Sequence, residues 1–347
     1  MSRLLIQEAV QQQSAVTVAG FVRNLRGHKG IMFADLVDRS GQLQLVFESG
    51  TPAYEVAEQL TLESIIEVTG EVQSKPPKQG STKKEYEVLV KEAKLISLAD
   101  ANLPIPVLAK ADNEADTENR FNWRWLDLRL PEHQLIFRTW TELEKGFRKY
   151  WDQADYLQIY TPTFMKTASE TGSEVFAVKY FDRQAYLAQS PQFYKQMAMA
   201  AGLEKVFAVG PVYRAEKSFT NRHHTEFTGW DFEISYIQSE ADIAQELEQM
   251  IVAGFKQVKE KLALDIVVPS LPFPRITLAE AKEKLAMAQI KSEVPDDFSA
   301  EEEQALGKIM KEETGHDFCF VTAYPFSARP FYHMKQEDDA NLTKSFD

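Results

Sequence analysis

Polar and hydrophobic residues alternate over much of the first hundred positions, and short turns interrupt the alternation. Leu43 and Leu45, for example, alternate with Gln42 and Gln44. Such a period of two predicts strands that bury one face, whereas the helical spacing of Tyr54, Ala57 and Leu60 predicts a short helix. The expected strands are 16–26, 30–38, 42–47, 64–73 and 85–96, and the expected helix is 53–60.

Five strands with a short helix between the third and the fourth form the pattern of an OB-fold barrel. One face of this fold suits single-stranded nucleic acid. Arg26, Phe33 and Gln44 are the candidates for contacts on that face, where an aromatic ring would contribute about 1–3 kcal/mol for each stacked base. The pattern alone leaves another interpretation open, in which Phe33 fills the barrel core and Arg26 is a solvated loop charge.

Beyond residue 120, helical and extended patterns mix without the regular alternation of a parallel α/β fold. Pro131 suits the first turn of a helix, and an apolar stripe continues from there to about Ala154. Ser299 and Glu302 form a capping-box pattern ahead of another helix, which Gly315 would end. Further strands are expected from 155 to Thr161–Pro162, where the proline would end the pairing, and at 185–190, 205–216 and 226–237. Further helices are expected at 191–202 and 241–262.

Composition limits the class of protein. The chain has 347 residues, of which 44% are hydrophobic and 26% charged, as in a globular protein of two domains. Its single cysteine, Cys319, excludes an intramolecular disulfide framework and a four-thiolate zinc site. No stretch approaches the ~18 apolar residues of a membrane helix, and the N-terminus lacks a secretory signal. We therefore expect a cytoplasmic protein with no membrane partner.

Charge distinguishes the two predicted parts. The net charge of −13 argues against sequence-independent binding of a polyanion, but not against a local nucleic-acid site. Residues 1–100 hold 11 basic and 13 acidic side chains, a balance of −2, so about −11 lies in the remainder. Residues 101–120 combine prolines, small residues and an acidic run without a clear period, which predicts a linker or hinge. The expected domains are 1–100 and 121–347.

One polar loop, between the strands expected at 205–216 and 226–237, concentrates candidate chemistry. A strand–loop–strand hairpin would gather its cations around a shared anion, and the planar guanidinium of Arg214 suits a phosphate or carboxylate. The chain contains neither GxGxxG nor GxxxxGK[ST], so side chains would have to bind a nucleotide. A solvated, salt-bridged loop is the alternative. The candidates are Arg214, Glu216, Arg222, His223, His224 and Phe227.

At this loop the sequence resembles a known family. YRAE (213–216), RHHTEF (222–227) and TGWDFE (228–233) resemble motif 2 of the class II aminoacyl-tRNA synthetases. The segments QSPQFYKQ (189–196), RWLDLR (124–129) and RPFYHM (329–334) narrow the resemblance to aspartyl-tRNA synthetases of the archaeal and eukaryotic type. It implies an α+β protein, in which an OB-fold domain reads the anticodon and a catalytic domain is built on an antiparallel sheet. It also implies that ATP and Mg²⁺ are used to make aspartyl-adenylate from L-aspartate, and that tRNA(Asp) accepts the aspartyl group. Whether tRNA(Asn) is charged as well stays open.

The resemblance implies roles in the nucleotide site. Arg214 would bridge the α-phosphate of ATP and the substrate carboxylate, and stabilise the charge that builds up as this carboxylate attacks. Glu216 would accept a hydrogen bond from the adenine amino group, and Phe227 would stack on the adenine. Arg222 and His223 would hold the outer phosphates. No general base is required, because a carboxylate is ionised at neutral pH.

The resemblance places amino-acid specificity in Gln192 and Lys195. A buried ammonium facing the substrate side chain favours a carboxylate over an amide, since a hydrogen bond between charged groups contributes roughly 1.5–3 kcal/mol. Related asparaginyl enzymes are expected to lack a lysine there, so Lys195 is the main reason to expect aspartate; a solvated helix lysine is the alternative. Glu170 matches a mobile loop that closes over the substrate and recognises its amino group. His224 replaces an expected leucine, and we assign it no role.

In the barrel, the resemblance makes Arg26, Phe33 and Gln44 candidates for anticodon contacts. Phe33 would stack on the central base, and the other two would contact base edges of the unpaired loop. Pro162 matches the motif 1 proline at a dimer interface, which implies a homodimer.

The family continues beyond the residues 345–347 into strands that carry an acidic magnesium ligand and into the Gly-rich motif 3, so metal ligands are not expected in this chain. Glu337, Asp338 and Asp339 lie in a polar run and are expected to be solvated. A catalytic sheet without its last strands would expose unpaired edges. Two interpretations remain: a C-terminally truncated aspartate–tRNA ligase that lacks aminoacylation activity by itself, or a non-catalytic paralogue that binds tRNA or an amino acid. The intact motifs favour the first.

Overall fold

A computed structural model describes most of the chain. Its described residues divide into two compact units, Met1–Leu135 and Ile136–Asp347. None of the helices in the described part is long and apolar enough to cross a membrane. The structure describes residues 2–12, 14–75, 85–108, 115–169, 174–216, 224–292 and 294–347.

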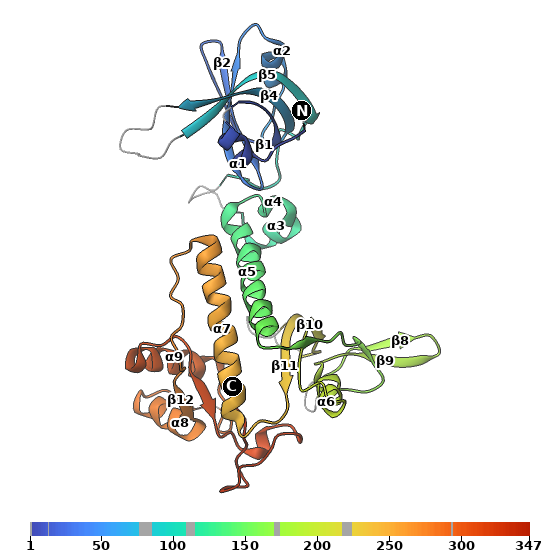
Figure 1. Cartoon of the computed structure of the whole chain (residues 1–347), viewed down its shortest axis with the longest axis vertical. Helices are drawn as coiled ribbons and strands as arrows, with labels where there is room; N and C mark the ends of the chain where they lie inside the picture. The colour runs from blue at the N-terminus through green and yellow to red at the C-terminus, as the bar shows by residue number, and fades with distance from the viewer. Residues whose placement is uncertain are drawn as a thin grey trace. The chain divides into compact units, whose positions relative to one another are not determined.

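The first unit contains the barrel that the alternating pattern predicts. The described strands form a closed barrel (Figure 1). Their order is β1-β2-β3-β5-β4, with α2 between β3 and β4 along the chain, which confirms the OB-fold. Leu43 and Leu45 point into the barrel core, at 3% and 0% exposure. The elements are α1 (Ile6–Gln12), β1 (Ala15–His28), β2 (Ile31–Asp38), β3 (Gly41–Glu48), α2 (Pro52–Ala57), β4 (Ile65–Lys75) and β5 (Glu85–Ser97).

The chain that follows β5 packs in part against the barrel. Ile105 and Val107 are buried, and the carbonyl oxygen of Val107 accepts a hydrogen bond from Arg23 Nη1 at 2.9 Å. Two short helices, α3 (Thr117–Asn122) and α4 (Arg124–Asp127), then precede α5 (Pro131–Gln153), which begins at the expected proline. The described part of the segment expected as a linker therefore contains buried residues and the start of a helix.

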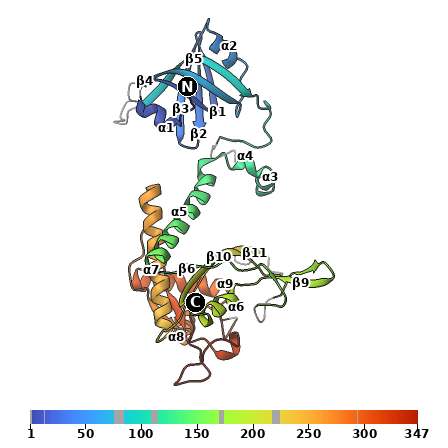
Figure 2. The same ribbon diagram turned by 45° about the vertical axis from the view of Figure 1, so that its right-hand side comes forward.

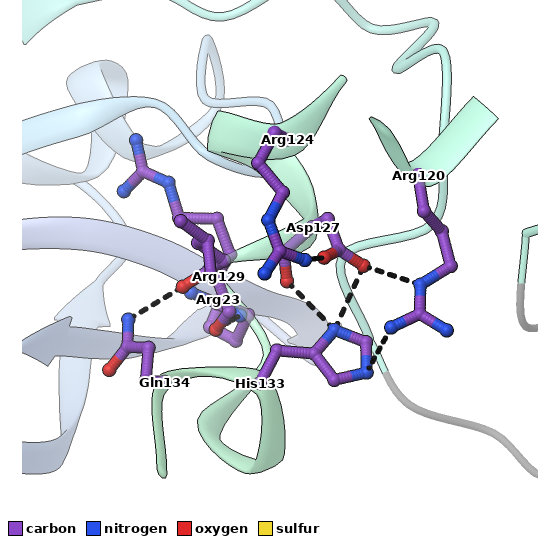
Figure 3. A network of polar contacts seen from close by, with 8 residues as sticks. Arg23, Arg120, Arg124, Asp127, Arg129, His133 and Gln134 are labelled. Carbon is purple, nitrogen blue, oxygen red and sulfur yellow. Dashed lines mark hydrogen bonds and ion pairs between the residues drawn. The ribbon is translucent and has the colours of Figure 1, made fainter. Parts of the chain in front are cut away.

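A polar network centred on Asp127 holds α3, α4 and the start of α5 together (Figure 3). Asp127 is 1% exposed and pairs with Arg124, with Arg120 Nε at 2.9 Å and with His133 Nδ1 at 2.8 Å. Burial acts to raise the pKa of Asp127, but the hydrogen bond from Arg120 and the charges around the carboxylate lower it overall. The RWLDLR segment thus places its carboxylate in a structural cluster.

The last arginine of the same segment contacts the barrel. Glu63 is buried, with Arg23 Nε 2.9 Å and Arg129 Nε 3.6 Å from its carboxylate oxygens. The Arg129 guanidinium also lies 3.4 Å from the ring centroid of Phe21 on β1. Burial raises the pKa of Glu63 in spite of both arginines. These contacts attach residues 124–129 to the barrel within the first unit.

The second unit is built on an antiparallel hairpin. Strands β10 and β11 pair from Lys205↔Ile234 to Tyr213↔Glu226, with the register that the strand–loop–strand prediction requires. The strand expected from 155 to Thr161–Pro162 is wrong in extent: only β6 pairs with β10, and a separate short strand, β7, follows the proline. The last backbone hydrogen bond to β10 runs from the Ile159 N–H to the Phe207 carbonyl oxygen. Residues 160–162 do not pair with β10. The elements are β6 (Leu157–Gln158), β7 (Phe164–Met165), β8 (Ala177–Tyr180), β9 (Arg183–Leu187), α6 (Gln192–Ala200), β10 (Lys205–Tyr213), β11 (Glu226–Ile234) and α7 (Glu240–Leu262).

One face of the hairpin packs against α5 and α7, which lie side by side in two views (Figures 1 and 2). Trp151 of α5 stacks on Phe207 of β10 with ring centroids 4.3 Å apart, and Phe147 meets Trp230 of β11 edge-on at 4.8 Å. Because side chains alternate along a strand, the remaining positions of β10 and β11 face the opposite side. The hydrophobic core therefore leaves one face of the hairpin available for a site.

A smaller layer follows α7. The predicted capping box is present, with Ser299 and Glu302 at the start of α9, and Gly315 ends that helix at φ 71°. A lysine on α8, Lys282, donates to Glu302 Oε1 at 2.6 Å and joins the two helices. The elements are β12 (Arg275–Thr277), α8 (Leu278–Met287), α9 (Ala300–Thr314), β13 (Phe320–Thr322) and the 3₁₀ helix η1 (Phe326–Ala328).

Candidate functional site

The face of the hairpin that points away from α5 and α7 lines a cavity of about 170 Å³. Ala208 and Gly210 of β10 and Gly229 and Asp231 of β11 contribute to its lining, and Pro191 comes from the residue before α6. The register pairs Ala208 with Asp231 and Gly210 with Gly229. Small residues at three of these four strand positions leave space above the sheet. We call this surface the pocket face.

Lys195 of α6 lies at one end of the pocket face. Its side chain is 6% exposed, and its Nζ is 2.9 Å from Asp231 Oδ1 and 3.4 Å from Glu233 Oε2. A solvated surface lysine, the alternative left by the sequence, does not fit this burial. A buried ammonium requires compensating charge, and the two carboxylates of β11 supply it.

Gln192 lies one helical turn before Lys195 and meets the same carboxylate. Its Nε2 is 3.5 Å from Glu233 Oε2, so Glu233 contacts both residues that the resemblance singled out for specificity. Asp231 and Glu233 were missed from the sequence. The signal that identifies them is their spacing of two on a strand, which places both acids on one face, together with the helix that presents Lys195 to that face.

Arg214 and Phe227 lie at the other end of the hairpin. The Arg214 Cζ is 5.5 Å from the ring centroid of Phe227, whose side chain is 38% exposed. The Nε of Arg214 is buried and has no hydrogen-bond partner among the described residues. A buried donor without a partner is rare in folded proteins. The buried Nε of Arg214 is therefore suited to bind an anion.

The structure describes part of the predicted nucleotide set. Glu216 follows β10 and is half-buried, and His224 is exposed near the start of β11. Glu170, Arg222 and His223 lie outside the described residues.

The barrel brings its three candidates to one outer face. Arg26 and Phe33 are Cα partners on β1 and β2, and Gln44 pairs with Asp35, two residues along β2 from Phe33. Phe33 is half-buried and does not belong to the barrel core, whereas its strand neighbour Ala34 does and Met32 packs against it. The interpretation in which Phe33 fills the core therefore does not hold. The Arg26 side chain is 58% exposed and lies 3.8 Å from Asp35.

Gln44 is held in one orientation by two charged neighbours that the sequence did not single out. Its Nε2 donates to Glu87 Oε2 at 2.9 Å, and its Oε1 accepts from Lys75 Nζ at 2.9 Å. Gln44 lies opposite Glu87 because β3 pairs in parallel with β5. The local sequence pattern does not predict this pairing. The outer face of the barrel thus presents a ring, a guanidinium and an oriented amide.

Pro162 is exposed and also lines the cavity, in the stretch between β6 and β7. Glu337, Asp338 and Asp339 are all exposed. Within the described ranges, no three His, Cys, Asp or Glu side chains are grouped so that they could hold a metal ion.

Fold and site together define a class II aminoacyl-tRNA synthetase: an OB-fold barrel precedes a hairpin whose face carries a buried lysine, paired acids and an arginine. Residues 16–96 match the model of the OB-fold nucleic acid binding domain, and residues 116–347 match that of the tRNA synthetases class II (D, K and N). The chain belongs to the tRNA synthetases class II (D, K and N).

Two curated relatives illustrate the match in sequence. The aspartate–tRNA(Asp/Asn) ligase of Methanopyrus kandleri is 38% identical over 342 residues, which cover 96% of this chain and 76% of the relative. The aspartate–tRNA(Asp) ligase of Pyrococcus abyssi is 36% identical over 344 residues, which cover 96% of this chain and 77% of the relative.

Solved structures of both amino-acid specificities are similar to this chain. Asparaginyl-tRNA synthetase from Pyrococcus horikoshii, complexed with asparaginyl-adenylate, has a TM-score of 0.88 and 28% identity, covering 100% of this chain and 80% of that one. Aspartyl-tRNA synthetase from Entamoeba histolytica has a TM-score of 0.82 and 27% identity, covering 100% and 76%. The fold is therefore shared by enzymes for aspartate and for asparagine, and the choice between them rests on side chains.

Proposed function

We propose that this protein binds L-aspartate and ATP on the pocket face and forms aspartyl-adenylate with release of pyrophosphate. The aspartyl group then passes to tRNA(Asp), and AMP leaves. The observation that carries the proposal is the buried ammonium of Lys195 beside the cavity, 2.9 Å from Asp231. An ammonium has three N–H donors and no acceptor. It can therefore donate to a substrate carboxylate, whereas it cannot satisfy the N–H₂ group of asparagine.

The proposed reaction needs positioning more than proton transfer. Aspartate would place its side-chain carboxylate at Lys195 and its ammonium group near Asp231, with Glu170 as the further candidate for the ammonium. Its α-carboxylate would then point along the hairpin toward Arg214. The guanidinium of Arg214 holds this carboxylate and the α-phosphate of ATP together and stabilises the charge of the transition state.

Phe227 supports the proposed nucleotide site, because its exposed ring beside Arg214 offers a stacking surface for adenine. Glu216 would accept from the adenine amino group, and Arg222 and His223 would bind the outer phosphates. Mg²⁺ would enter with the phosphates of ATP, whose charge it neutralises.

The barrel is the proposed site for the anticodon of tRNA(Asp), with Phe33 stacking on a base and Arg26 and Gln44 at base edges. The relatives include enzymes named for tRNA(Asp) alone and for both tRNA(Asp) and tRNA(Asn), so tRNA(Asn) is the second candidate. The exposed Pro162 between β6 and β7 is the proposed centre of a homodimer contact. Because tRNA charging takes place in the cytoplasm, the protein is expected there.

A second candidate function is activation of asparagine, favoured by the similarity to a structure that holds asparaginyl-adenylate. Calorimetric titration of the 347-residue chain with L-aspartate and with L-asparagine separates the two. Binding is the suitable readout, because it does not require the complete catalytic cycle. Aspartate is expected to bind and asparagine to bind at least about 10-fold more weakly, the ratio that corresponds to one charged hydrogen bond.

The matched variants are Lys195→Met and Lys179→Met. Lys179 is exposed on β8 and serves as the control. The Lys195 variant is expected to lose aspartate binding while ATP binding stays close to that of the unaltered chain. Equal losses of both ligands, or tight binding of asparagine by the unaltered chain, would contradict the proposal.

A further inference from the structure

Two glycines face each other across the centre of the β10–β11 hairpin. Gly210 and Gly229 are Cα partners in the antiparallel register. A glycine inside a strand weakens the sheet and often marks a place where a ligand or another backbone comes close. A pair of them, opposite each other in the strands that form the pocket face, requires a reason.

Backbone conformation does not supply that reason. Neither glycine has the positive φ that Gly30, Gly50, Gly202 and Gly315 have in the described chain. A residue with a side chain could therefore adopt the same backbone geometry at both positions.

Packing within the protein does not supply it at Gly210 either. A Cβ built on Gly210 finds no atom of the described residues within 4 Å, so a side chain would enter space that they leave open. At Gly229 the result differs, because a Cβ would lie 2.9 Å from Asp231 Oδ2. Gly229 thus leaves room for the carboxylate that pairs with Lys195, while the room above Gly210 is not filled by any residue that the structure describes.

The register shows what that space separates. The neighbouring pairs on the same face are Val212↔Phe227 on one side and Ala208↔Asp231 on the other. Successive residues on one face of a strand are about 6–7 Å apart. The glycine pair is therefore one step from the Arg214–Phe227 end and one step from the Asp231–Lys195 end, and both glycines line the cavity.

We propose that Gly210 is the clearance position of this site: its bare backbone lies under the part of the ligand that joins nucleotide to amino acid. The inference rests on the proposed function and adds to it a residue that selects for an aminoacyl-adenylate, a ligand that spans both ends at once. A side chain at this position would leave each end of the pocket face intact and block the ligand that connects them.

The test is Gly210→Val in the 347-residue chain, titrated with three probes. These are L-aspartate, ATP and a stable sulfamoyl analogue of aspartyl-adenylate. The control is Gly27→Val on β1, a strand glycine of the barrel where a Cβ also meets no described atom within 4 Å. We expect the Gly210 variant to bind the analogue about 10- to 100-fold more weakly, the range of an overpacked site. Aspartate and ATP, titrated separately, should bind as they do to the control.

If the variant binds the analogue as tightly as the control does, or loses separate aspartate and ATP binding to the same extent, the clearance role is wrong. If the unaltered chain itself fails to bind the analogue, the proposed function fails and the inference fails with it. Thermal unfolding of both variants checks the fold, and if Gly210→Val unfolds early, Gly210→Ala makes the same comparison with a single methyl group.

Discussion

Lys195 Nζ lies 2.9 Å from Asp231 Oδ1, and this pair joins α6 to β11 on the pocket face. The two partners differ in exposure, since the lysine side chain is 6% exposed and the aspartate 29%. A buried charge that loses its partner costs about 3–5 kcal/mol, so the ammonium is held in place by its acidic partners, of which Asp231 lines the cavity. This arrangement presents a fixed positive charge to a ligand and an acid beside it.

Replacing Arg214 with lysine is expected to weaken ATP binding by about 10-fold or more, because lysine keeps the charge and loses the planar, bidentate fork. Titration with a fluorescent ATP analogue measures this. Arg183→Lys is the control, since Arg183 on β9 is 75% exposed. Unchanged ATP affinity in the Arg214 variant would remove it from the nucleotide site.

Phe33→Leu tests the barrel. Loss of one stacked base corresponds to about 1–3 kcal/mol, so affinity for a short RNA hairpin with the tRNA(Asp) anticodon should fall roughly 5- to 150-fold. The matched control is Ile96→Ala, which removes an apolar side chain that is 52% exposed on β5. Equal affinity of both variants for the hairpin would show that Phe33 does not contact the RNA.

The crossing of α5 and α7 depends on Gly146. A Cβ there would lie 2.6 Å from the Cα of Gly254 and 2.7 Å from the carbonyl oxygen of Ala253. Gly146→Ala is therefore expected to destabilise the fold by about 1–3 kcal/mol through overpacking. Gly307→Ala in α9 meets no atom within 4 Å and is expected to stabilise by about 0.5–1 kcal/mol. Chemical denaturation compares the two, and loss of stability in both or in neither would contradict the argument.

Glu302 gives a pH dependence with a defined sign. Burial acts to raise its pKa, but hydrogen bonds from Lys282 and the Ser299 backbone lower it to about 2, against an ordinary value of 4.5. Because the folded-state pKa is the lower one, the ionised carboxylate stabilises the protein fully above pH 4.5. This contribution is lost as the pH falls toward 2.

The variant Glu302→Gln should therefore be less stable than the unaltered chain at neutral pH, by up to about 3 kcal/mol. The difference should shrink as the pH is lowered from 4.5 to 2. Glu301→Gln, on the exposed side of the same helical turn, is the control. A stability difference that stays constant over this pH range would contradict the assignment.

Local pattern was enough to predict the barrel strands, the α9 caps and the hairpin, because each depends on neighbours in sequence. It was not enough where the partner is distant. Ile105 and Val107 are buried in a segment without a period, and the length of β6 is set by its pairing with β10. The resemblance supplied Lys195, but its paired acids became evident from the sheet register.

The central claim is that Lys195 selects a carboxylate. The most direct measurement is a competition between the sulfamoyl analogues of aspartyl-adenylate and asparaginyl-adenylate for the unaltered chain and for Lys195→Met. The account predicts that the unaltered chain prefers the aspartyl analogue by about 10-fold or more and that the variant loses this preference. Equal binding of the two analogues by the unaltered chain, or a preference that survives in the variant, would contradict it.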